Sequence, residues 1–140
     1  MKFEYKAFMP SAPNEKWVRM PFVEVEVVGP RDSRRGVALV DSGAEYCLIN
    51  MEFAEKLGID LRNSRKINFH GVAGHEHVKS AHLAKVMIQI SGMEEKVEVE
   101  AGFIDSSAVS IILGQQDFFD THRIKFEKDH NTFEITQVKK

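Results

Sequence analysis

The sequence predicts an all-β fold, mostly strands with two short helices, and two observations carry this prediction. First, apolar and polar residues alternate at period two in several short segments, such as 23–27 and 84–90, which is typical of a strand with one buried face. Second, turn signals such as Gly29-Pro30 and Ser91-Gly92 separate these segments at short intervals. Many short strands between frequent turns favour a β-barrel or a β-sandwich.

The bulk properties predict one soluble globular domain and argue against several function classes. The chain has 140 residues, 43% hydrophobic and 29% charged, with a formal net charge of −2. This charge predicts no strong attraction to nucleic acid or to an anionic membrane surface, and no apolar stretch approaches the ~20 residues of a membrane-spanning helix. The first six residues carry charges where a secretory signal has its apolar run, and Cys47 has no second cysteine for an internal disulfide. We therefore expect a cytoplasmic protein.

The chain divides into an N-terminal arm or edge segment over 1–20 and a folded domain over 21–140. The first part shows no clear period and contains Pro10 and Pro13. The domain opens with the alternating strand described above, and a second, more buried strand is predicted over 37–40.

A short helix is predicted after residue 50. Asn50 is a good N-cap, Phe53 and Leu57 share a face, and Gly58 fits the left-handed stop position. The later elements expected along the chain are a strand-like stretch over 67–90 interrupted at 71–74, a strand over 97–103, a short buried strand over 111–113, a helical turn over 116–120 and a last hairpin turning at 129–131.

A carboxylate directly follows the second strand, in the segment Asp41-Ser42-Gly43-Ala44. Gly43 allows a sharp turn and leaves its N–H free to face a carboxylate. Ser42 can lock the loop through a side-chain hydrogen bond, and Ala44 leaves room for close packing. Asp41 is then held near the interior, where a lone anion is costly, so the segment is a candidate catalytic loop.

A plain surface turn is the alternative interpretation, because Asp-Ser-Gly is a common turn tripeptide. Surface turns are normally flanked by polar residues, whereas the residues on both sides of this loop, 37–40 and 47–49, are apolar. This context favours a functional loop.

Three segments in the right order resemble the retropepsin-like aspartic proteases, the single-domain group that includes retroviral proteases and the protease-like domain of DNA-damage-inducible shuttle proteins. Residues 39–44 resemble the catalytic loop of that family, 71–74 lie where it has a glycine-containing flap, and 111–114 resemble its second apolar-apolar-glycine motif. The resemblance implies an acid-protease barrel with one lobe per chain. It implies a catalytic role for Asp41, Ser42 and Gly43, and substrate contacts for Ala44, Gly71, Val72, Ala73 and Gly74.

The chemistry of this family uses two carboxylates that share one proton, and the chain offers one suitable loop. The segments that begin at Asp32, Asp105 and Asp120 lack the glycine, and none of them follows a convincing buried apolar strand. The resemblance therefore implies a homodimer with one Asp41 from each chain, an extended or unfolded peptide as substrate, and no metal or organic cofactor. The alternative is a catalytically inactive module of the same fold that dimerises or binds peptides.

Two positions depart from the retroviral pattern. Gly114 is followed by Gln115, where retroviral enzymes usually have an arginine, and Glu45 follows Ala44. These residues are closer to the shuttle-protein or bacterial type.

Other residues invite competing interpretations. His70, His75, His77 and His82 could suggest a metal site, but their spacing matches no standard zinc motif, so we expect no metal and interpret the flap histidines as solvated or facing the substrate. Cys47 lies in an apolar run and is expected to be a buried structural thiol. For Trp17 and Phe22 core packing is the default expectation, with contacts to an arm or a dimer partner as the alternative.

Overall fold

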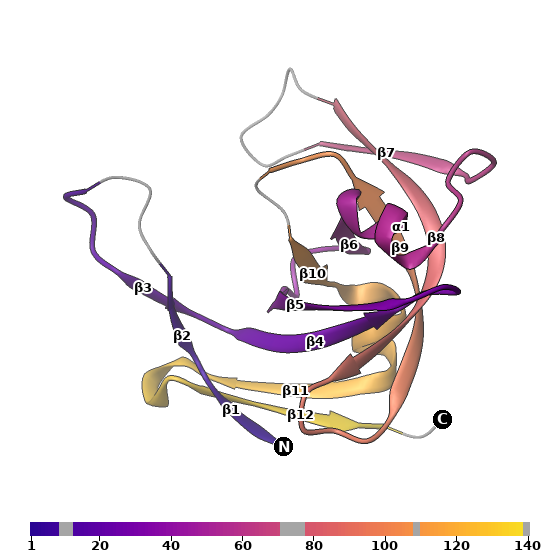
Figure 1. Cartoon of the computed structure of the whole chain (residues 1–140). Helices are drawn as coiled ribbons and strands as arrows, with labels where there is room; N and C mark the ends of the chain where they lie inside the picture. Colours follow the sequence, from indigo (N-terminus) through magenta and orange to yellow (C-terminus); the bar gives the residue numbers. More distant parts are fainter. Residues whose placement is uncertain (9–12, 71–77, 108–109, 139–140) are drawn as a thin grey trace.

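A closed β-barrel forms the centre of the computed structural model, which describes residues 1–8, 13–70, 78–107 and 110–138. The barrel strands follow one another in the order β4 (Phe22–Val28), β5 (Ser33–Val40), β10 (Ile111–Leu113), β6 (Cys47–Asn50), β9 (Lys96–Ile104) and β8 (Val78–Ile90). The ring closes because β8 also pairs with β4, and β7 (Lys66–His70) extends the sheet beyond β8 (Figure 1). The predicted mostly-β fold is confirmed.

The alternating pattern of the strands places their apolar side chains inside the barrel. In β4, Val23, Val25 and Val27 are buried, whereas Glu24 between them is exposed. Each side chain of this size stabilises the fold by roughly 1.5–3 kcal/mol when it is fully buried. No helix within the described residues is both long and apolar enough to cross a membrane.

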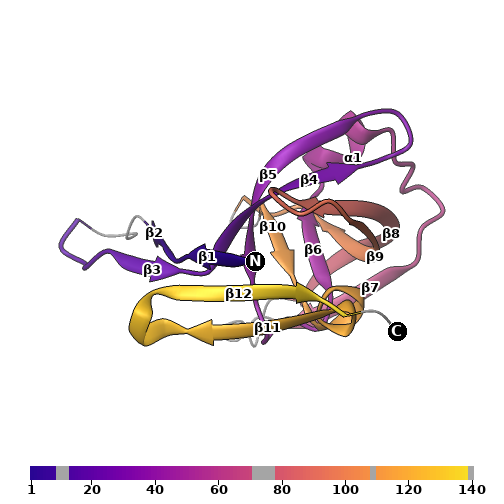
Figure 2. The same ribbon diagram turned by 90° about the horizontal axis from the view of Figure 1, so that it is seen from below.

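A second sheet is formed by both ends of the described chain. β1 (Lys2–Glu4) pairs with β12 (Thr132–Gln137), which pairs with β11 (His122–Glu127). This sheet lies as a separate layer below the barrel (Figure 2), and its buried Phe133 and Ile135 belong to the common hydrophobic core. Within the sheet the ring of Phe133 stacks on that of its cross-strand partner Phe3 at a centroid distance of 5.4 Å. The predicted last hairpin is confirmed, with η2 (Lys128–His130) at its turn.

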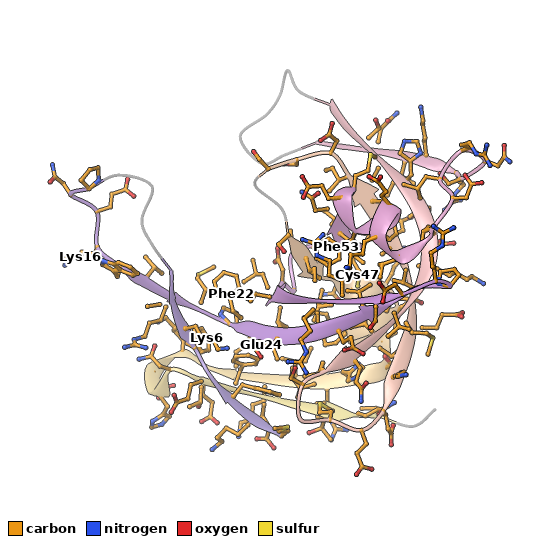
Figure 3. The ribbon with its side chains drawn as sticks, viewed as in Figure 1. Lys6, Lys16, Phe22, Glu24, Cys47 and Phe53 are labelled. Carbon is orange, nitrogen blue, oxygen red and sulfur yellow. The ribbon has the colours of Figure 1, made fainter. Side chains whose placement is uncertain are left out.

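The N-terminal ribbon consists of β2 (Lys6–Phe8) and β3 (Val18–Met20), which among the described strands pair only with each other. It projects away from the barrel, with Lys16 toward its far end and Phe22 at its root (Figure 3). Trp17 is 61% exposed, so the expectation of core packing was wrong for this residue, because the ribbon brings no second layer over its side chain. Phe22 is partly buried.

The predicted short helix is α1 (Glu52–Leu57), and its buried Phe53 and Leu57 face the barrel. Gly58 adopts the expected left-handed conformation, with φ of 75°. The N-cap is Met51, so the predicted N-cap Asn50 lies one residue before the observed one. Its Oδ1 still accepts the N–H of Glu52 at 3.0 Å, so the side chain satisfies one of the free donors of the first turn.

Candidate active site

Asp41 lies at the end of β5, where two parallel strands meet. Strands β5 and β10 pair up to Val40 opposite Leu113, and the Asp41 N–H continues this ladder by donating to the Leu113 carbonyl at 3.0 Å. The side chain is partly buried. The barrel therefore fixes the backbone of the candidate catalytic carboxylate, in the position that the apolar flanks predicted.

The loop after Asp41 is a tight turn that holds the carboxylate. The Ala44 N–H donates to the Asp41 carbonyl at 3.2 Å, and the Gly43 N–H donates to Asp41 Oδ1 at 2.9 Å. A Cβ on Gly43 would lie 3.2 Å from the same Oδ1, so a larger residue would press on the carboxylate. Within the described residues the hydroxyl of Ser42 makes no hydrogen bond. The carbonyl of Ser42 instead connects this residue to the rest of the fold, because it accepts a hydrogen bond from the side chain of Gln115.

The second apolar-glycine motif interlocks with this loop. The N–H of Gln115 donates to the Ala44 carbonyl at 2.8 Å, and the N–H of Gln116 donates to the Glu45 carbonyl at 2.8 Å. Gly114 permits this approach, because a Cβ there would collide with the carbonyl of Tyr46. Two segments about 70 residues apart thus form one rigid unit.

The turn that follows, η1 (Gln115–Phe119), differs from the regular helical turn that the sequence predicted. Asp117 has φ of 68° and ψ of −48°, a strained conformation for a residue with a side chain. Its carboxylate accepts the N–H of Glu100 from β9 at 2.7 Å, and its carbonyl accepts the hydroxyl of Thr121 at 2.6 Å. These contacts hold the bend in place and tie it to the barrel.

Cys47 packs directly beneath the interlocked loops. Its Sγ accepts the Gly114 N–H at 3.4 Å and lies 3.8 Å from the Gln116 carbonyl. The side chain is fully buried, and burial raises the pKa of the thiol to about 11. The thiol is therefore protonated near neutral pH, in agreement with the predicted structural role.

The predicted flap residues 71–74, together with His75 and His77, lie outside the described residues. The strands on either side of them, β7 and β8, pair antiparallel. His82 on β8 has its Nδ1 3.0 Å from the hydroxyl of Ser64. Among the described residues, no group of three or more His, Cys, Asp or Glu side chains could hold a metal ion.

A cavity of about 600 Å³ lies away from the candidate catalytic loop. Residues of β1 to β4 line it together with Tyr5 and Ser91, and no residue of the loop 41–44 takes part. It is a space between the N-terminal segment and the outside of the barrel, so it gives no support to a substrate site.

The barrel and the interlocked loops define a retropepsin-like aspartic protease domain with one lobe per chain. The chain belongs to the family described as "gag-polyprotein putative aspartyl protease", whose sequence profile matches residues 32–121. The matched region contains both the candidate catalytic loop and the second apolar-glycine motif.

Solved structures share the fold at low sequence identity. The retroviral protease-like domain of Ddi1 from Leishmania major is 22% identical with a TM-score of 0.55, and 85% of this chain and 90% of that chain are covered. A retropepsin-like aspartic protease from Rickettsia conorii is 15% identical with a TM-score of 0.53, covering 82% and 89%. No curated protein sequence matches the chain significantly.

Proposed function

We propose that the protein is an aspartic endopeptidase that acts as a homodimer, with Asp41 of each chain forming the catalytic dyad. The observation that carries this proposal is the carboxylate of Asp41, which the Gly43 N–H holds at 2.9 Å at the end of a barrel strand. Membership of an aspartyl protease family supports the same reaction.

We infer the need for a second chain from the surroundings of the other aspartates that directly precede a serine or threonine. Asp32 accepts the N–H of Ser33 at 2.8 Å, and Asp120 accepts the N–H of Asp117 at 3.0 Å. Both residues therefore fix local turns, and Asp105 is exposed. Among the described residues Asp41 alone combines the strand-end position with the glycine turn, so one chain provides half of a dyad.

The two-fold symmetry of a dimer places like groups together. One Asp41 carboxylate takes a proton from the attacking water, and the protonated partner donates a hydrogen bond to the carbonyl oxygen of the scissile bond. The water oxygen bonds to the carbonyl carbon, and the C–N bond then breaks as the amine nitrogen receives a proton. Ser42 and Gly43 orient the dyad in this proposal.

The proposed substrate is an extended or unfolded peptide bound as an added strand, because main-chain hydrogen bonds then recognise many sequences. Ala44 provides part of the floor beneath it, and Gly71, Val72, Ala73 and Gly74 are proposed to cover it. Side-chain pockets would set the preferred cleavage sites.

The test is cleavage of fluorescently labelled casein, an unfolded protein, between about pH 4 and 6. We expect the wild-type chain to cleave it and Asp41→Asn to lose cleavage while keeping the same circular dichroism and melting temperature. Cleavage that persists in the folded Asp41→Asn chain would disprove the assignment. A folded dimer that cleaves neither casein nor a library of peptides would instead support the inactive binding module.

A further inference from the structure

The side chain of Gln115 contacts the catalytic loop at the peptide group that holds the carboxylate. Its Nε2 donates to the carbonyl of Ser42 at 2.6 Å. The same peptide group ends in the N–H of Gly43, which donates to Asp41 Oδ1 at 2.9 Å. The amide of Gln115, the Ser42–Gly43 peptide and the carboxylate therefore form one continuous line of hydrogen bonds.

This line has two physical effects on the carboxylate. A peptide group is planar, so a donor that fixes its carbonyl also fixes the direction of its N–H. Hydrogen bonds in a chain also polarise one another, and a bond accepted by the carbonyl strengthens the N–H as a donor. The Ser42 and Gly43 positions are exposed, so without the amide of Gln115 this peptide group is free to rotate toward water.

Hydrogen bonds fix both the backbone of Gln115 and the chain that follows it. Its backbone N–H donates to the Ala44 carbonyl at 2.8 Å, which closes a second contact with the same loop. Two residues later the chain is anchored by Asp117 through Glu100 of β9 at 2.7 Å. The side chain therefore reaches Ser42 from a rigid base, which reduces the entropy lost in making the bond.

We propose that Gln115 is a positioning residue, which holds the Ser42–Gly43 peptide so that its N–H points at the Asp41 carboxylate. The structural part of this proposal is independent of the activity. Its catalytic consequence rests on the proposed protease function, because Gln115 acts on the carboxylate through the peptide and does not touch the reacting atoms.

Two variants of similar size remove the donor. Gln115→Met keeps the length of the side chain without an N–H, and Gln115→Glu replaces the donor with an acceptor that the Ser42 carbonyl repels. The matched control is Gln89→Met, because Gln89 is a glutamine whose Nε2 also donates to backbone carbonyls, those of Met93 and Glu94 at 3.0 and 3.2 Å, in a turn remote from the loop.

The first readout is the Gly43 amide in proton–nitrogen NMR spectra and hydrogen exchange. We expect its proton resonance to move upfield and its exchange to accelerate at least about threefold in both Gln115 variants, with no change in Gln89→Met. An unchanged Gly43 amide in a folded Gln115→Met and Gln115→Glu would overturn the proposal.

The second readout is cleavage of labelled casein. We expect kcat to fall between about twofold and tenfold in the Gln115 variants, the range for loss of one hydrogen bond, while KM stays within about twofold. A wild-type chain that cleaves nothing would refute the protease function and leave the Gly43 result to decide the role of Gln115. A rise in KM at constant kcat would show that Gln115 serves binding instead.

Discussion

The backbone N–H of Val40 donates to the carbonyl of Pro21 at 3.0 Å. Pro21 directly follows the N-terminal ribbon and Val40 directly precedes Asp41, so the ribbon joins the barrel beside Asp41. A dimer axis that passes between two Asp41 residues therefore passes close to the root of each ribbon. The exposed Val18 is on strand β3 of this ribbon and the exposed Trp17 directly precedes it, and large exposed apolar side chains often mark contact surfaces.

We accordingly expect Trp17→Ser to weaken the dimer. Tryptophan is a frequent hot spot of interfaces, and its removal commonly costs at least ~2 kcal/mol of binding, so the dissociation constant should rise more than about tenfold in sedimentation experiments. At protein concentrations low enough to keep the chain monomeric the melting temperature should change little, because Trp17 is 61% exposed in its own chain. An unaltered dissociation constant would place the ribbon outside the interface.

Two glycines of the site should respond differently to alanine. In Gly114→Ala the new Cβ collides with the Tyr46 carbonyl and lies 2.8 Å from that of Ala44. Because both are backbone atoms that cannot rotate away, we expect a loss of about 2–3 kcal/mol in the free energy of unfolding, measured by urea denaturation.

In Gly43→Ala the new Cβ lies 3.2 Å from Asp41 Oδ1 and meets no other described atom closely. The carboxylate then shifts by a few tenths of an ångström, which we expect to reduce kcat about tenfold or more while stability changes by less than about 1 kcal/mol. Equal losses of stability in the two variants would contradict this separation.

The same residues show what the sequence could predict. The Asp41 loop was visible because apolar residues flank a turn tripeptide, and the alternation in β4 predicted its buried face. Both signals are local. The bond from Gln115 to Ser42 joins positions 73 residues apart. The positive φ of Asp117 is stabilised by contacts with Glu100 and Thr121. No local sequence pattern predicts this bond or this backbone conformation. Trp17 was misplaced for the related reason that residue type alone does not tell whether a second layer covers a strand.

Mixing the wild-type chain with Asp41→Asn tests directly whether the two chains share one site. A mixed dimer has one carboxylate and is expected to be inactive. If chains exchange freely, an equal amount of Asp41→Asn leaves about half of the wild-type chains in active dimers, and a threefold excess leaves about a quarter. Casein cleavage should fall by these factors at constant wild-type concentration. Cleavage that stays constant while sedimentation shows chain exchange would mean that each chain is active alone.

The proposed cleavage in mildly acidic solution makes the behaviour of His122 important for stability. The residue is buried, its ring stacks on Phe118 at a centroid distance of 4.5 Å, and its Nδ1 lies 2.9 Å from the Phe118 carbonyl. Burial lowers the pKa of His122 below the ordinary histidine value of 6.5, because the charged ring loses its hydration.

The folded chain therefore binds this proton more weakly than the unfolded chain. This difference fixes the direction in which the free energy of unfolding changes with pH. The stability that the neutral ring contributes is present above about pH 6.5 and is lost as the pH falls from there toward the lower pKa of the folded state. We expect the free energy of unfolding in urea to decrease less between pH 7 and 5 in His122→Gln than in the wild type, even if His122→Gln is less stable at pH 7. Comparing the two slopes cancels the carboxylates, which titrate in both proteins. His130→Gln is the matched control, because the side chain of His130 is exposed. If His130→Gln changed the pH dependence of the free energy of unfolding as much as His122→Gln does, the buried ring of His122 would not be its source.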